Sequence, residues 1–123
     1  MTEQRLFDVE QANAALAEVV PLLERLRAAH ATMDQRQDEV TTSAPTNGGG
    51  AAHAAFLQAG GEVSRVLDAL ERLGVVVRDP ATGLIDFPSE RDDEPVFLCF
   101  RLGETEVAWW HPTDTGFSGR RPL

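Results

Sequence analysis

The fold is decided by residues 96–110, which read VFLCFRLGETEVAWW. Two runs rich in β-branched and aromatic side chains flank Gly103 and Glu104, and such runs are typical of strands. A tight turn at these two residues predicts a β-hairpin. In the register that a two-residue loop sets, Phe100 faces Val107 on the neighbouring strand.

This predicted hairpin is apolar on both faces. One face holds Val96, Leu98, Phe100, Val107 and Trp109. The other face holds Phe97, Cys99, Ala108 and Trp110. A sheet that is apolar on both sides must be covered twice. We expect helices to cover one face, and either the C-terminal tail or a second copy of the chain to cover the other. The sequence therefore predicts a homodimer, formed through the remaining apolar face of the sheet, through the apolar stripes of the helices, or through both.

The first half of the chain predicts two antiparallel helices, over residues 8–42 and 51–73. In both segments apolar residues recur at spacings of three and four, the pattern of helices that pack along each other. Asp8 and Gln11 have the spacing of a capping box at the start of the first helix. Pro21 lies off the apolar stripe, so we expect a kink there or two helices in line.

The second half of the chain predicts antiparallel strands over residues 75–111, with a charged loop at residues 88–94. Residues 112–123 form a C-terminal tail that carries most of the polar motifs. We expect residues 1–123 to form a single domain, because 123 residues suffice for one hydrophobic core. The predicted fold is α+β, a long antiparallel helical hairpin packed on a small antiparallel sheet of three to four strands.

The composition excludes several classes of function. The formal charge of −9 argues against nucleic-acid and membrane partners, because phosphate groups attract basic surfaces. All 11 basic side chains are Arg, so Schiff-base chemistry on Lys and a P-loop are excluded. A single cysteine, Cys99, excludes an intrachain disulfide and a thiolate-rich zinc site. Residues 1–7 do not resemble an export signal, and we expect a soluble, cytoplasmic protein.

Candidate site residues gather after the last predicted strand. His111 and Asp114 are the candidates for binding a divalent metal, or Asp114 orients His111 for proton transfer. Arg120 is a candidate for holding a carboxylate or a phosphate in a bidentate contact. The same three side chains have an equally good structural interpretation, in which they bond to the backbone and to neighbouring acids.

Other chemistry-bearing residues favour structural roles. We interpret Cys99 as a small buried apolar residue, because the predicted register sets His111 opposite Val96 on the other face of the hairpin. His30 and His53 lie at different levels of the helical hairpin and cannot share an ion within it.

Several motifs resemble the family known as domain of unknown function 2203. They are GLIDFP at 83–88, LCFRLGE at 98–104, WH at 110–111, GFSGRRP at 116–122 and the opening LFDVEQAN at 6–13. The likeness covers nearly the whole chain, and Phe100 departs from it where Trp is expected. The resemblance implies no reaction. It implies that the polar motif residues are candidates for one shared pocket, and these are Asp86, Arg101, Glu104, His111, Asp114 and Arg120.

Two functions remain open. The first is a non-enzymatic, homodimeric binding or assembly module, whose C-terminal motif is structural or binds a small anionic ligand through Arg120, Arg101 and Asp86. The second is a small hydrolase- or lyase-like enzyme, with or without a divalent metal, in which His111 is the acid/base and Arg120 holds an anionic substrate. Asp114 or Glu104 would orient His111. The sequence shows no cofactor motif and no nucleophile–base pair, which favours the first function.

Overall fold

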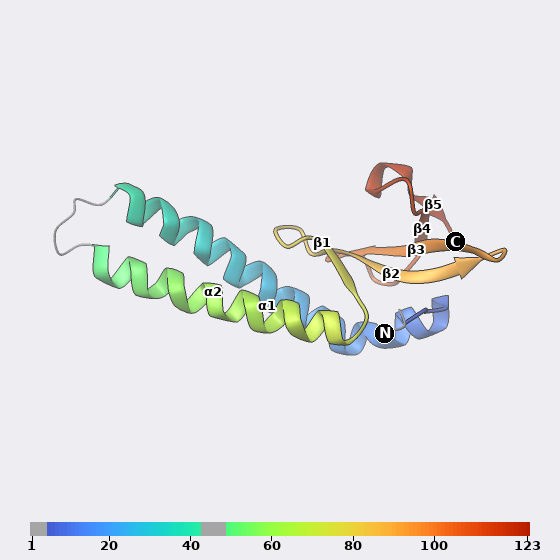
Figure 1. Ribbon diagram of the computed structural model, residues 1–123, viewed down its shortest axis with the longest axis horizontal. Coiled ribbons are helices and arrows are strands. Elements are labelled where there is room, and N and C mark those ends of the chain that lie inside the picture. The colour runs from blue at the N-terminus through green and yellow to red at the C-terminus, as the bar shows by residue number, and fades with distance from the viewer. Residues whose placement is uncertain (1–4, 43–48) are drawn as a thin grey trace.

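The computed structural model describes residues 5–42 and 49–123. Helix α1 (Val9–Thr42) and helix α2 (Gly49–Arg72) form an antiparallel hairpin, and one end of this hairpin lies under a sheet (Figure 1). The sheet has five antiparallel strands in sequence order. They are β1 (Val76–Asp79), β2 (Leu84–Arg91), β3 (Glu94–Arg101), β4 (Trp109–Pro112) and β5 (Arg121–Pro122). The predicted α+β class is confirmed, and the sheet is larger than the three to four strands expected.

Helix α1 starts at the predicted capping box. The backbone N–H of Gln11 donates to Oδ1 of Asp8 at 2.7 Å, and the backbone N–H of Asp8 donates to Oε1 of Gln11 at 3.0 Å. Pro21 lies inside one uninterrupted helix of 34 residues, so the alternative of two helices in line is wrong. The apolar stripes of the two helices meet in a core. Its fully buried helical members are Ala12, Val19, Leu23, Leu26, Val66 and Leu70.

The tight hairpin turn lies at Asp92 and Asp93, inside the segment 88–94 for which we predicted a loop. Both aspartates have positive φ, 52° and 64°, which is the conformation of a type I′ turn. Strand β2 runs through Pro88, which pairs with Phe97 on β3. The carbonyl of Pro88 points away from β3 and accepts the N–H of Phe7. The N–H and the carbonyl of a residue in an antiparallel strand point to the same side, so the N–H that proline lacks is not one that would have bonded to β3.

The predicted hairpin turn at Gly103 and Glu104 is wrong, because residues 102–108 form a longer connection. Oε1 of Glu104 accepts the N–H of Arg101 at 2.7 Å, which closes a local turn before β4 can begin. The N–H of Val107 donates to Oδ1 of Asn13 on α1 at 2.7 Å, so this backbone is held by the helix.

The longer connection moves β4 by one residue along β3. Cys99 now pairs with Trp109, whereas the prediction placed Leu98 there. A slip of one residue transfers every side chain of a strand to the opposite face. His111, which pairs with Phe97, therefore lies on the face of the sheet that carries Cys99, and the predicted separation of these two side chains is wrong.

The two faces of the sheet have different covers. The helix face packs into the core with α1 and α2, and it is defined by Ile85, Phe87, Leu98 and Phe100. The polar face is defined by Asp86, Phe97, Cys99, Trp109 and His111. Figure 1 shows the C-terminal segment, with the 3₁₀ turn η1 (Phe117–Gly119) and β5, on the side of the sheet away from the helices. The C-terminal tail thus covers part of the second face of the sheet. It was one of the two covers expected for this face, the other being a second copy of the chain.

Candidate functional site

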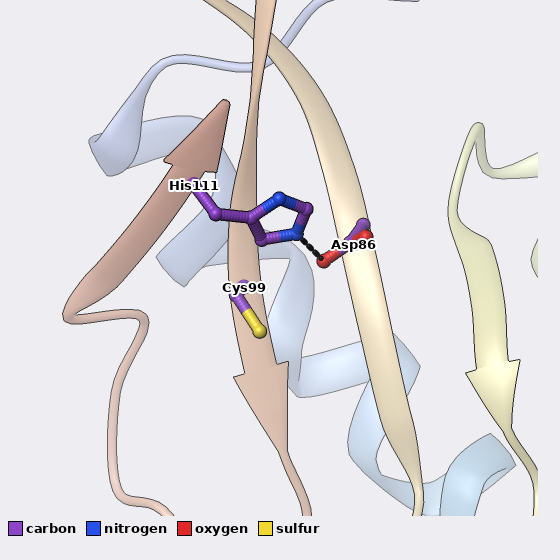
Figure 2. Close-up of side chains that lie close together, drawn as sticks. All are labelled: Asp86, Cys99 and His111. Carbon is purple, nitrogen blue, oxygen red and sulfur yellow. Dashed lines mark hydrogen bonds and ion pairs between the residues drawn. The ribbon is translucent and has the colours of Figure 1, made fainter. Parts of the chain in front are cut away.

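Three adjacent strands of the polar face bring Asp86, Cys99 and His111 together (Figure 2). Asp86 on β2 pairs directly with Cys99 on β3, and His111 on β4 lies diagonally beside Cys99. Each residue is no more than 2% exposed. Polar atoms of the three side chains lie within 4.8 Å of one another. Alternation along β2 explains the placement, because Ile85 and Phe87 point into the core and Asp86 must point the other way.

Both ring nitrogens of His111 face hydrogen-bond acceptors. Nδ1 lies 2.8 Å from the carbonyl oxygen of Pro112, and Nε2 lies 3.0 Å from Oδ1 of Asp86. The carbonyl can only accept, so Nδ1 carries a hydrogen atom. An ionised carboxylate can also only accept, so the second contact needs a further proton between Nε2 and Oδ1. The pair of His111 and Asp86 therefore holds one proton in a buried place.

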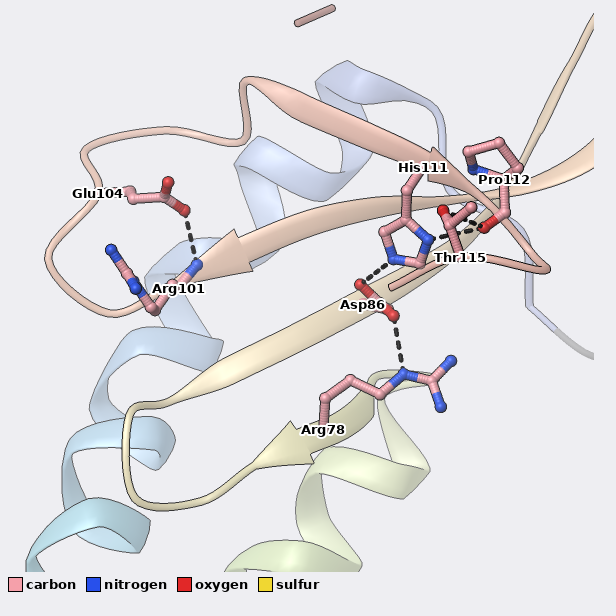
Figure 3. Close-up of polar contacts among 7 residues, drawn as sticks. All are labelled: Arg78, Asp86, Arg101, Glu104, His111, Pro112 and Thr115. Atoms are coloured by element: carbon pink, nitrogen blue, oxygen red, sulfur yellow. Dashed lines mark hydrogen bonds and ion pairs between the residues drawn. The ribbon is translucent and has the colours of Figure 1, made fainter. Parts of the chain in front are cut away.

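Arg78 holds the other oxygen of Asp86 (Figure 3). Its Nε donates to Oδ2 at 2.8 Å, and its guanidinium lies 4.9 Å from the centre of the Phe97 ring. The pairing of β1 with β2 shifts register between Val77 and Asp79, and a bulge of this kind redirects the side chain that it contains. The Nη atoms of Arg78 make no hydrogen bond within residues 5–42 and 49–123, and its side chain is 44% exposed.

The Cys99 thiol is a poor nucleophile in this environment. Burial, and then the negative charge of Asp86, raise its pKa from 9.0 to about 12, although the Arg120 charge acts in the opposite direction. A thiolate is the reactive form, so a proton-bearing thiol at neutral pH is unreactive. The interpretation of Cys99 as a small buried residue agrees with this environment. The reason given for it was wrong, because His111 lies on the same face of the sheet as Cys99 and next to it.

A pocket of about 260 Å³ opens over these side chains. Its floor is the polar face, and residues of the C-terminal segment line its other side. The lining residues are Arg78, Leu84, Asp86, Cys99, His111, Thr113, Thr115, Gly116 and Phe117. The pocket thus combines a guanidinium, two hydroxyls and the buried pair of His111 and Asp86 in one small space.

Arg120 and Glu104 do not line this pocket. Nη2 of Arg120 donates to Oε2 of Glu104 at 2.6 Å, and the guanidinium lies between the rings of Trp109 and Phe117 at 4.8 and 4.6 Å. Glu104 also accepts the N–H of Arg101 (Figure 3). This cluster ties the C-terminal segment to the connection before β4, so it holds the pocket's cover in place.

Asp114 is exposed and lies apart from His111 at another hollow. That hollow measures about 490 Å³ and lies near the tip of the β2–β3 hairpin, beside Arg91 and Trp110. The carboxylate that meets His111 is Asp86, which the sequence suggested only for ligand binding. Sequence reasoning did not name Arg78 as a site residue. The pairing of β1 with β2 could have indicated it, because Val76 lies opposite Asp86 and Arg78 follows two residues later on the same strand.

A family model described as "Uncharacterized conserved protein (DUF2203)" matches residues 5–123. The chain belongs to this family. The resemblance suggested by the motifs is confirmed over nearly the whole chain. Of the polar motif residues, Asp86 and His111 line the pocket, and Arg101, Glu104 and Arg120 cluster beside its cover.

No curated protein and no solved structure matches the chain. Within residues 5–42 and 49–123, no helix has both the length and the hydropathy to cross a membrane.

Proposed function

We propose that this protein binds a small anionic ligand in the pocket between the polar face and the C-terminal segment. The observation that carries the proposal is the state of Arg78. Its guanidinium is fixed at Nε by a buried carboxylate and lies over an aromatic ring, yet its Nη donors are unused within the described residues. A guanidinium held in this way presents two donors in the geometry that a carboxylate or a phosphate accepts.

The charges around the pocket favour an anion. The side chain of Arg78 is 44% exposed, whereas that of Asp86 is 2% exposed and its carboxylate is bonded to Arg78 and His111. The thiol of Cys99 is neutral at physiological pH, because its pKa is about 12. An anion that enters the pocket therefore meets the positive guanidinium of Arg78, although the whole chain is acidic. The hydroxyl group of Thr113 adds a neutral donor along the wall, whereas the hydroxyl group of Thr115 donates to the carbonyl of Pro112 at 3.3 Å.

The size of the pocket limits the ligand. A volume of about 260 Å³ lies just below the roughly 300–1,000 Å³ of most small-molecule sites. The space suits inorganic phosphate, sulfate or a short carboxylic acid. Larger ligands would have to displace the segment around Gly116.

Binding is favoured over the enzymatic alternative by the contacts of His111. An acid/base group must reach a proton on the substrate with a ring nitrogen. Here Nδ1 faces the carbonyl of Pro112 and Nε2 faces Asp86, so both nitrogens are already engaged. Arg120, which the alternative needs for holding the substrate, is paired with Glu104. The polar groups are arranged to position Arg78 rather than to transfer protons.

Isothermal titration calorimetry of metal-free protein with phosphate, sulfate and acetate tests this function. We expect saturable binding of at least one of these anions at one site per chain. Arg78→Gln should weaken it by at least about tenfold, since a lost charge-assisted contact exceeds 1.4 kcal/mol. Arg72→Gln is the matched control, because Arg72 pairs with Asp68 on the surface of α2. Equal binding by both variants, or none by the natural chain, would reject the proposal.

We also infer that the protein is cytoplasmic, since a lone buried thiol is typical of a reducing compartment. The homodimer stays a prediction. Its reason was the bare second face of the sheet, which the C-terminal segment covers in part. The surface left for a second copy includes the far end of the helical hairpin, where Leu57 is 58% exposed. A dimer mass in native mass spectrometry would support this prediction, and a monomer mass alone would reject it.

A further inference from the structure

We infer that Asp86, Cys99 and His111 form a binding site for a transition-metal ion of the Zn²⁺ type at the floor of the pocket. The three side chains come from adjacent strands of a rigid sheet and point to one side (Figure 2). Their potential ligand atoms lie within 4.8 Å of one another. In the described part of the chain, no other three His, Cys, Asp or Glu side chains gather in this way.

The distances suit an ion after a small contraction. Zinc binds sulfur at about 2.3 Å and nitrogen or oxygen at about 2.0–2.2 Å, so tetrahedral ligands lie about 3.3–3.7 Å apart. Nε2 of His111 and Oδ1 of Asp86 are already 3.0 Å apart and would separate slightly around the ion. The Cys99 sulfur lies on the strand between them, and rotation about its side-chain bond brings it closer or moves it away.

The donor set selects the class of metal. One imidazole nitrogen, one sulfur and one carboxylate oxygen are ligands that Zn²⁺ and related divalent transition metals accept. Calcium and magnesium prefer sites made of oxygen atoms alone. The set therefore favours an ion that binds sulfur over the hard cations.

Neighbouring groups hold two of the ligands in the required orientation. A metal-binding histidine usually donates its other ring N–H to a carbonyl or a carboxylate. Nδ1 of His111 does so to the carbonyl of Pro112 at 2.8 Å, which leaves Nε2 for the ion. Arg78 binds Oδ2 of Asp86, which leaves Oδ1 turned toward the same point.

The balance of charge is also satisfactory. An entering divalent ion replaces two protons, the one on the Cys99 thiol and the one held between His111 and Asp86, and both protons go to the buffer. The ion then has thiolate, carboxylate and neutral imidazole around it. Three protein ligands leave a fourth position, and the pocket of about 260 Å³ lies over the cluster. Sites of this type bind an exchangeable water or a small ligand in that position.

Titration of metal-free protein with Co²⁺ in a non-coordinating buffer tests the site. Cys99 is the only thiol in the chain, so a sulfur-to-cobalt charge-transfer band in the near ultraviolet reports on it alone. We expect the band to saturate at one Co²⁺ per chain and to disappear when Zn²⁺ displaces the cobalt. Absence of the band at micromolar protein with excess Co²⁺ would overturn the inference.

Variants assign the ligands. Cys99→Ala should abolish the band, and Asp86→Asn and His111→Gln should each weaken Co²⁺ binding at least tenfold. His53→Gln is the matched control, because His53 is exposed on α2, and it should bind as the natural chain does. Equal binding by His111→Gln and the natural chain would contradict the inference. If a ligand variant does not fold, the band of the natural chain still decides, since it needs no substitution.

This inference does not depend on the proposed anion binding. The cobalt titration contains no phosphate or carboxylate and reads out the Cys99 sulfur. The anion titration uses metal-free protein and reads out Arg78. Each result can therefore fail while the other holds.

Discussion

The two faces of the sheet are built from the same strands, yet one face packs into the apolar core and the other carries a buried polar cluster. On β2, Ile85 and Phe87 are fully buried against the helices, while Asp86 between them points to the C-terminal segment. On β3, Cys99 alternates with apolar neighbours in the same way. A period of two residues thus places a dry core and a buried ionic cluster on opposite sides of one layer.

The two faces of the sheet also differ in the kind of structure that covers them. The helix face packs into one apolar core with residues of α1 and α2. The polar face is covered by an irregular segment, which Arg120 and Glu104 fasten at one point. From this difference we infer that the pocket over the polar face depends on the C-terminal segment. The stability of the fold depends mainly on the core shared with the helical hairpin.

The largest effect on this comparison is expected from the helix face. Phe87→Ala removes a ring that is 0% exposed and packs edge-on against Phe7, with centroids 5.0 Å apart. We expect a loss of about 3–5 kcal/mol in the free energy of unfolding, measured by urea denaturation. Glu90→Ala, at the exposed end of the same strand, should change it by less than about 0.5 kcal/mol. Similar losses from both variants would break the comparison.

A smaller effect is expected when the polar face loses its buried charge. Asp86→Ala leaves the ring of His111 without a partner at Nε2, while Arg78 regains water because it is partly exposed. We expect a loss of about 2 kcal/mol in the free energy of unfolding, because a buried polar atom becomes unsatisfied. Asp68→Ala removes a carboxylate from an exposed ion pair and should cost less than about 1 kcal/mol. An Asp86→Ala protein as stable as the natural chain would contradict this account of the cluster.

An effect that depends on pH follows from the pKa of Cys99, which burial raises to about 12 from 9.0. Between these values the unfolded thiol loses its proton while the folded thiol keeps it, so the free energy of unfolding falls as pH rises. The limiting slope is about 1.4 kcal/mol per pH unit. The chain has no Lys and no Tyr, so Cys99 is the one side chain that titrates in this window. Urea denaturation of metal-free protein should show the slope, and Cys99→Ala should lack it; equal slopes would reject the assignment.

Local patterns predicted the helical part of the fold correctly. The spacing of apolar residues and the capping box of Asp8 and Gln11 are properties of neighbouring residues, and both are confirmed. The turn at Asp92 and Asp93 was missed because the charged run at residues 88–94, which begins with Pro88, suggested a loop. Strand β2 accepts a proline at position 88 because the carbonyl of Pro88 points away from β3 and accepts the N–H of Phe7.

The site could be predicted only in part. Asp86 and His111 were among the candidates, but the predicted register separated His111 from Cys99. The connection before β4 is bonded to α1 through Val107 and Asn13, which lie 94 positions apart, and no local pattern contains this contact. Arg78 was missed because its direction depends on a bulge in β1. Positions set by long-range contacts thus decided which side chains meet.

The central claim is that the polar face, and not the helical part, receives a ligand. Two-dimensional ¹H–¹⁵N spectra of the protein during titration with inorganic phosphate test it most directly. The account predicts that the signals of Arg78, Thr115 and Gly116 shift together and saturate, while those of α1 and α2 remain in place. Saturable shifts confined to the helical hairpin, or no saturable shift with any of phosphate, sulfate and acetate, would contradict it.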